Sequence, residues 1–204
     1  MRSAATAAVV FVVLAVAGCG GERQDEDEPE GEFTLSVVDA SFPARQSIAQ
    51  AATMRIAVRN TDDRELPNLA VTVETEPAGG EAAPASFAQA VDDPRLASAD
   101  KPVWVLDEGP EGGTTAYTNT WAVGPIPAGE ERELEWRLTA VRPGRYTVNY
   151  RVAPGLDGRA VAAGGQDAAG SFQVRISDEP VPATVNGRGE VVRGDGDGDA
   201  AGRD

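Results

Sequence analysis

The alternation of apolar and polar residues limits the fold of this chain more than any other feature of its sequence. In residues 146–152, apolar or aromatic side chains occupy every second position, which is the pattern of a strand that buries one face. No part of the sequence shows a long helical period, and residues 47–52 could form at most one turn. Because Gly- and Pro-rich turns separate the alternating segments, the sequence predicts antiparallel strands packed as a sandwich or barrel. The alternating segments are residues 33–37, 54–59, 69–74, 117–123, 134–138, 146–152 and 172–176.

The link between the fifth and sixth of these segments carries a second signal. The fifth segment runs on to Val141, Pro143-Gly144 follows, and Tyr146 begins the next strand. This order is similar to the tyrosine corner of immunoglobulin-like sandwiches, in which the tyrosine hydroxyl bonds back to the backbone of the corner. The alternative is that Tyr146 simply packs inward. We expect an all-β fold, an immunoglobulin-like antiparallel β-sandwich of about seven strands, over residues 33–178.

Short motifs widen this resemblance to a family. A strand that ends in Asn60-Thr61 is followed by a polar turn and a second alternating strand, and Gly- and Pro-containing turns precede two later strands. These motifs resemble those of bacterial CARDB-type immunoglobulin-like modules. The resemblance implies an extracytoplasmic binding, spacer or adhesion module, and it carries over no catalytic residue. Residues 75–115 depart from the family pattern, because they form more than a hairpin loop. The motifs are residues 54–61, 66–71, 126–130 and 143–146.

The N-terminus has the order of a secretory signal peptide. A basic start at Arg2 is followed by an apolar stretch over residues 4–17 and by small residues. At ~1.5 Å per residue this stretch reaches about 21 Å, too short for the ~30 Å of hydrocarbon in a bilayer. Val16-Ala17-Gly18-Cys19 resembles a bacterial lipobox, which implies cleavage before Cys19 and a diacylglycerol lipid on its thiol. The alternatives are an ordinary signal peptide with a chance cysteine, or a buried free thiol.

Two acyl chains hold a protein stably on a membrane. We therefore expect a protein attached through Cys19 to the extracytoplasmic face of the cell membrane. The next thirteen residues, 20–32, contain no apolar side chain, so we expect a disordered acidic tether with a maximum reach of ~45 Å. It would act as a spacer, or it would be a charged tail of no consequence. The expected divisions are a signal peptide at 1–18, a tether at 19–32, the sandwich at 33–178 with a long loop at 75–115, and a polar tail at 179–204.

Composition narrows the possible functions. Removing residues 1–18 takes away Arg2 alone among the charged residues, so the net charge changes from −15 to −16. Such a chain repels nucleic acid, and we expect no nucleic-acid partner. The sequence has no histidine and one cysteine, which the lipid would occupy. We therefore expect no catalytic residues, no metal and no cofactor other than the lipid. A hydrolase that uses carboxylates alone on envelope polysaccharide is kept as an alternative.

Two further segments are candidates for binding. Trp104, in the long loop, could contact a partner, or it could cover the sandwich as part of an extra edge strand. Asp195-Gly196-Asp197-Gly198-Asp199 resembles the start of a calcium loop but lacks its later ligands, and the alternative is a disordered acidic tail. The sequence thus predicts a non-enzymatic binding or adhesion module for an extracytoplasmic protein or an envelope polymer. A passive structural spacer is the first alternative, and the hydrolase is the second.

Overall fold

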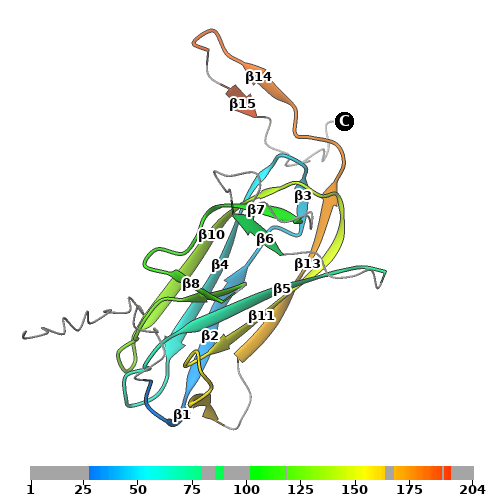
Figure 1. The fold of residues 1–204 in the computed structure, drawn as a ribbon. Helices are drawn as coiled ribbons and strands as arrows, with labels where there is room; N and C mark the ends of the chain where they lie inside the picture. The colour runs from blue at the N-terminus through cyan, green and yellow to red at the C-terminus, as the bar shows by residue number, and fades with distance from the viewer. Residues whose placement is uncertain are drawn as a thin grey trace, which may run out of the picture.

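The chain folds as two β-sheets packed face to face (Figure 1). A computed structural model describes residues 28–79, 86–89, 102–117, 119–163, 168–189 and 191–193. The five-stranded sheet has the order β2 (Leu35–Ser41), β4 (Ala51–Asn60), β10 (Glu131–Ala140), β7 (Trp104–Glu108) and β6 (Phe87–Gln89). The six-stranded sheet has the order β3 (Arg45–Ser47), β13 (Ala168–Ser177), β11 (Gly144–Ala153), β5 (Ala70–Pro77), β9 (Thr120–Ala122) and β8 (Thr114–Tyr117).

This strand order is that of an immunoglobulin-like sandwich. Most neighbouring strands are antiparallel, and the chain passes from one sheet to the other between β2 and β3. There β3 pairs in parallel with β13, the last strand of the sandwich. The predicted all-β sandwich is confirmed, although it has more strands than the seven expected. The segment expected to be a long loop, residues 75–115, contributes to an edge of each sheet: it supplies β6 and β7 in one sheet and the first two residues of β8 in the other.

The apolar face of each alternating strand forms the core between the sheets. On β11 the side chains of Tyr146, Val148, Tyr150 and Val152 are all buried, as the period of two requires. Aromatic rings form a continuous chain of contacts through this core, with centroids 5.3–6.2 Å apart. Rings at such separations attract each other in addition to burying apolar area. The rings are those of Phe42, Phe87, Trp104, Trp121, Trp136, Tyr146, Tyr150 and Phe172.

The tyrosine corner is present as predicted. The Tyr146 hydroxyl donates to the carbonyl oxygen of Pro143 at 3.0 Å, with the carbonyl of Arg142 at 3.3 Å. The ring lies against Gly144, where a Cβ atom would stand 2.8 Å from the hydroxyl oxygen. Gly144 also has a φ of 150°, which L residues rarely adopt. The Pro-Gly-x-Tyr order of the sequence is therefore a requirement of this corner.

Asn60, the residue that ends β4 in the family-like motif, has a structural role. Its side chain is fully buried, and its amide nitrogen donates to the carbonyl oxygens of Arg64 at 2.8 Å and Ile126 at 2.9 Å. Its side-chain oxygen accepts the backbone N–H of Asp62 at 2.9 Å. All the polar atoms of this amide are used within the fold, so Asn60 fixes a turn and is not free to bind a ligand.

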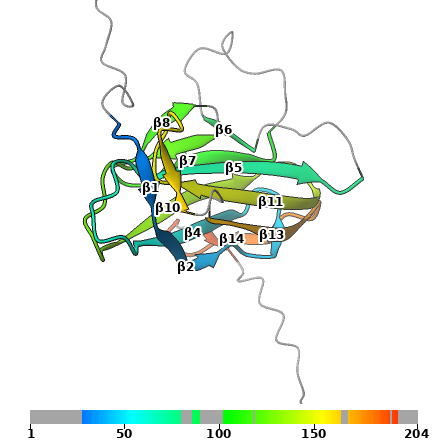
Figure 2. The same cartoon turned by 90° about the horizontal axis from the view of Figure 1, so that it is seen from below.

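The folded part of the chain begins earlier than the sequence indicated. Glu28 is only 5% exposed, and β1 (Gly31–Phe33) pairs in parallel with β12 (Ala160–Ala162) at the lower end of the sandwich (Figures 1 and 2). Residues 28–32, expected to be part of a disordered tether, instead belong to the domain. The prediction was wrong here because it rested on the lack of apolar residues, whereas Glu28 is held by hydrogen bonds.

The C-terminal segment also contains more structure than expected. Residues after Ser177 continue into an antiparallel hairpin of β14 (Ala183–Val185) and β15 (Val191–Arg193), at the end of the sandwich opposite β1 (Figure 1). The expectation of a disordered tail is therefore wrong for this part of residues 179–204. Asn186, Gly187 and Gly189 lie in the turn between the two strands, where Gly189 has a φ of 81°.

Candidate binding face

The structure places Trp104 in the core and not at a partner contact. Its side chain is 0% exposed, and its indole Nε1–H donates to Oε1 of Gln46 at 2.8 Å. The ring also contacts Phe42 and Tyr146, at centroid distances of 5.4 and 5.7 Å. The interpretation of Trp104 as a possible partner contact is wrong, because β7 pairs with β10 and turns this side chain inward. The alternative interpretation, in which Trp104 belongs to an extra strand that covers the sandwich, is closer to the structure. The edge strand of this sheet is β6, however, and β7 lies one position further in.

Several other predicted features lie outside the described residues. These are Cys19 and the run from Asp195 to Asp199. Within the described ranges, no group of three or more His, Cys, Asp or Glu side chains is arranged to hold a metal ion. The same ranges contain no helix that is long and apolar enough to cross a membrane.

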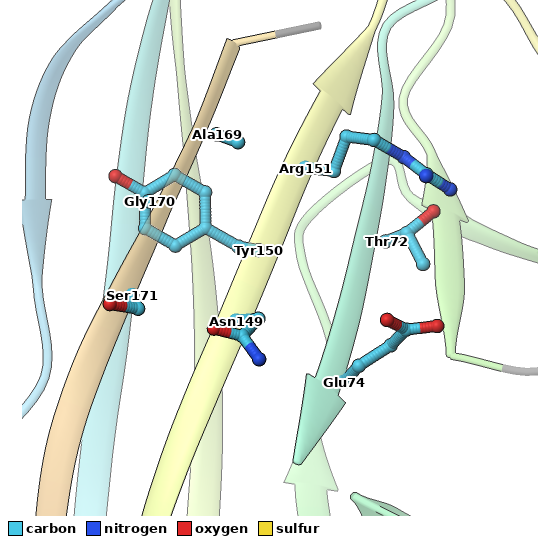
Figure 3. A pocket seen from close by; sticks show the side chains of 8 residues that line it. All are labelled: Thr72, Glu74, Asn149, Tyr150, Arg151, Ala169, Gly170 and Ser171. Carbon is cyan, nitrogen blue, oxygen red and sulfur yellow. The ribbon is translucent and has the colours of Figure 1, made fainter. Parts of the chain in front are cut away.

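A pocket of about 390 Å³ lies on the six-stranded sheet (Figure 3). Its walls come from β5, β11 and β13, three neighbouring strands whose register brings their residues together. Asn149 on β11 is opposite Glu74 on β5 and Ser171 on β13, and Arg151 is opposite Thr72 and Ala169. The lining residues are Thr72, Glu74, Asn149, Tyr150, Arg151, Ala169, Gly170 and Ser171.

The shape of the pocket follows from small residues on β13. Tyr150 is buried, and its ring lies against Gly170, where a Cβ atom would stand only 2.3 Å from the tyrosine hydroxyl oxygen. Only glycine therefore allows the ring to take this position. Ala169 and Ser171 are the flanking residues, and their short side chains leave the β13 side of the pocket low and open. The larger side chains of Arg151 and Glu74 stand on the opposite side (Figure 3).

The pocket offers donors and acceptors for hydrogen bonds. In the described part of the chain, the side chains of Glu74, Asn149 and Ser171 make no hydrogen bond with the protein, so their polar atoms are open to solvent or a ligand. The Thr72 and Thr120 hydroxyls bond to each other at 2.9 Å, and Arg151 already has an interaction within the protein. Burial, with a smaller contribution from the charge of Asp39, raises the pKa of Tyr150. Its hydroxyl therefore keeps its proton at neutral pH.

The arrangement suits recognition better than hydrolysis. Hydrolysis of a glycoside by carboxylates needs two of them facing each other across the substrate. Among the lining residues, Glu74 is the single carboxylate. The pocket therefore gives no support to the hydrolase alternative. Hydroxyl, amide, carboxylate and guanidinium groups in one shallow site are those that bind a polar ligand through hydrogen bonds.

Sequence reasoning did not find this face. The outward positions of residues 146–152 could be read from the alternation, because they are the polar ones. The pairing of β11 with β5 and β13, which brings Glu74 and Ser171 beside Asn149, comes from strands far apart in the sequence. A pattern within one short segment of the sequence cannot predict how such distant strands pair.

Comparison with known proteins identifies neither a family nor a function for this chain. No protein-family model matches the chain, and no curated protein matches it. Among solved structures, it is similar to the CARDB domain of a Pyrococcus furiosus protein solved in complex with di-metal ions, with 16% identity and a TM-score of 0.43, covering 73% of this chain and 98% of that one. It is also similar to native alpha-2-macroglobulin from Escherichia coli, with 13% identity and a TM-score of 0.42, covering 74% of this chain and 18% of that one.

A third similar structure is a cohesin module from a Clostridium perfringens family 33 glycoside hydrolase, with 10% identity and a TM-score of 0.39, covering 72% of this chain and 98% of that one. All three TM-scores are below 0.5, so we transfer no ligand, metal or activity from these proteins. The class rests on the strand order and the tyrosine corner of this chain itself.

Proposed function

We propose that this chain is a lipid-anchored extracytoplasmic protein whose immunoglobulin-like sandwich is a non-enzymatic binding module. Its partner is an envelope polymer or an extracytoplasmic protein, and the binding surface is the outer face of the six-stranded sheet. The observation that carries the proposal is the pocket on this face, where Glu74, Asn149 and Ser171 keep their hydrogen-bonding capacity unused. A passive spacer would have no need for such a site.

The anchor is supported by the order of the N-terminal sequence, with its basic start, apolar stretch and Cys19. The structure describes the chain from Glu28 onward, and residues 20–27 lie between it and Cys19 in the sequence. Eight residues reach at most about 29 Å at ~3.6 Å each. The β1 end of the sandwich would then face the membrane, and the end that carries β3 and the hairpin would face away from it (Figure 1).

Replacing Cys19 with alanine should move the protein from the detergent phase to the aqueous phase in a phase-partitioning assay. The reason is that the substitution removes the thiol that would receive the lipid, and with it two acyl chains at ~0.8 kcal/mol for each buried CH₂. Gly20→Ala is the matched control and should leave the partitioning unchanged. If the Cys19 variant partitions like the wild type, the protein has no lipid on this residue.

Replacing Ser171 with tryptophan should weaken ligand binding at least ten-fold, because the indole would fill the pocket from its open side without touching the core. The assay is an array of purified envelope polysaccharides and extracytoplasmic proteins, probed with the full-length protein in non-ionic detergent. Glu133→Trp places the same side chain on the other sheet, where Glu133 is exposed on β10, and should have no effect. Equal binding by both variants would argue against the pocket, and no binding by the wild type would favour the spacer alternative.

A further inference from the structure

The arginines on the two outer faces of the sandwich are in different environments. On the five-stranded sheet, three arginines of β4 and β10 each form an ion pair with a glutamate. Arg55 pairs with Glu135, Arg59 with Glu131 and Arg137 with Glu108, each at 2.9 Å. This face therefore neutralises its own positive charges across neighbouring strands.

The six-stranded sheet carries three arginines in one row. Arg175 on β13 is the register partner of Arg45 on β3 and of Arg145 on β11. All three side chains are exposed, whereas the next residues, Gln46 and Tyr146, are buried, so the arginines share the outer face. Strands lie about 4.8 Å apart, so the row spans about 10 Å. Within the ranges that the structure describes, none of the three guanidinium groups has an ion pair or a hydrogen bond.

Such a row is unfavourable for the isolated protein. Like charges directly opposite each other on neighbouring strands are destabilising. The chain contains 33 acidic residues against 18 basic ones, so acidic partners are abundant and the other face uses them. The closest acidic residue in the sheet register is Glu76 on β5, opposite Thr147, and it borders the row without pairing with it. A negatively charged ligand would remove the repulsion.

We propose that Arg45, Arg145 and Arg175 form a docking row for the phosphate groups of an envelope polymer. An arginine fork matches phosphate oxygens in two-bonded geometry. Three forks within about 10 Å exceed what one carboxylate accepts, whereas phosphate oxygens take bonds from several arginines. This inference rests on the proposed binding function and specifies the chemistry of its ligand.

A polymer fits better than a single small anion because the row continues into the pocket. Thr147 and Gln173, which bond to each other at 3.1 and 3.2 Å, lie between the arginine row and the pocket residues Asn149 and Ser171. Arg175 and Ser171 are four positions apart on β13, which is about 13 Å along the strand. A chain of repeating units that binds the row at one end can therefore reach the pocket.

A membrane surface fits less well. β3 and the end of β13 lie at the end of the sandwich opposite β1, from which the chain leads back toward Cys19 (Figure 1). The row would therefore face away from the bilayer that holds the anchor. The net charge of −16 on the mature chain also opposes approach to anionic lipid.

The test uses inorganic polyphosphate as the probe and the full-length protein in non-ionic detergent, so that the result does not depend on the anchor. The triple variant Arg45→Gln, Arg145→Gln, Arg175→Gln should bind at least ten-fold more weakly and show a smaller dependence on salt. The matched control is Arg55→Gln, Arg59→Gln, Arg137→Gln, which removes the same charge from the other face. It should stay within about two-fold of the wild type. Thermal melting of both variants checks that they are folded.

Four results would overturn the proposal. Equal weakening by both triple variants would mean that net charge alone drives binding, and failure of the wild type to bind polyphosphate would mean that there is no site. Equal binding of polygalacturonate would exclude phosphate as the preferred group. Vesicles of phosphatidylglycerol that bind through the same arginines more tightly than polyphosphate would make the ligand a lipid surface. The proposed function is tested separately by the Cys19 and Ser171 variants, so its failure can be distinguished from failure of the phosphate proposal.

Discussion

Replacing Trp104 with alanine is expected to lower the free energy of unfolding by about 3–5 kcal/mol. The side chain is fully buried, it touches the rings of Phe42, Phe87 and Tyr146, and it bonds to Gln46. The substitution would leave a cavity at the centre of the aromatic chain and an unpaired amide oxygen on Gln46. Urea unfolding in non-ionic detergent, followed by the fluorescence of the remaining tryptophans, measures the change.

The matched variant is Trp104→Phe, which keeps a ring in the core and removes only the indole N–H. It should lower the free energy of unfolding by less, about 1–3 kcal/mol, because its main effect is to leave the buried side-chain oxygen of Gln46 without a donor. A change below ~0.5 kcal/mol for the alanine variant is what surface positions give. That result would contradict the buried position and return Trp104 to the list of candidate contact residues.

Replacing Glu28 with alanine is expected to cost about 2–3 kcal/mol, although the sequence around it is that of a charged tail. Both carboxylate oxygens accept the backbone N–H of Leu156 at 2.9 Å, one accepts that of Asp157 at 3.3 Å, and Asn68 donates to the other at 3.4 Å. Removing the carboxylate would leave these buried or partly buried donors without an acceptor. Glu30→Ala is the control, since Glu30 is exposed and two residues away, and it should change stability by less than ~0.5 kcal/mol.

The same carboxyl should give a pH signature. Burial is the largest influence on Glu28, and it raises the pKa above the model-peptide value of 4.5. The folded state then binds more protons than the unfolded state, so this contribution to stability is lost as the pH rises from 4.5 through the folded pKa. In the same loop, a hydrogen bond from the backbone N–H of Arg159 is the main cause that lowers the pKa of the Asp157 carboxyl. The contribution of Asp157 to stability is therefore lost only as the pH falls below 3.8, outside the range in which Glu28 acts. Glu28→Gln should remove the loss of stability above pH 4.5. If the free energy of unfolding of this variant changes with pH as steeply as that of the wild type, the raised pKa does not belong to Glu28.

The sequence predicted those parts of the fold that depend on neighbouring residues. Alternation identified the faces of β4, β10 and β11, because a strand with one buried face repeats every two residues. Pro143-Gly144 before Tyr146 identified the corner, because the tyrosine bonds to a carbonyl only three residues away. Asn60 was recognised as part of a motif, and the structure supplies its reason in a set of hydrogen bonds within the fold.

The sequence could not predict features that depend on distant residues. Glu28 bonds to Leu156, which lies 128 positions away, so a window of acidic residues gave no sign of order. For Trp104 the sequence allowed two interpretations, a partner contact or a strand that covers the sandwich, and the pairing of β7 with β10 decides between them. The arginine row needs the register of β3, β13 and β11 together, and its three residues lie 30 and 100 positions apart in the chain.

The central claim is that the outer face of the six-stranded sheet is the binding surface, and nuclear magnetic resonance can test it residue by residue. The signals to follow are the arginine side-chain Nε–Hε groups of the full-length protein in detergent micelles as polyphosphate is added. We predict that the signals of Arg45, Arg145 and Arg175 shift, whereas those of Arg55 and Arg59, which pair with glutamates, stay in place. Shifts confined to the second group, or spread equally over both, would contradict the account.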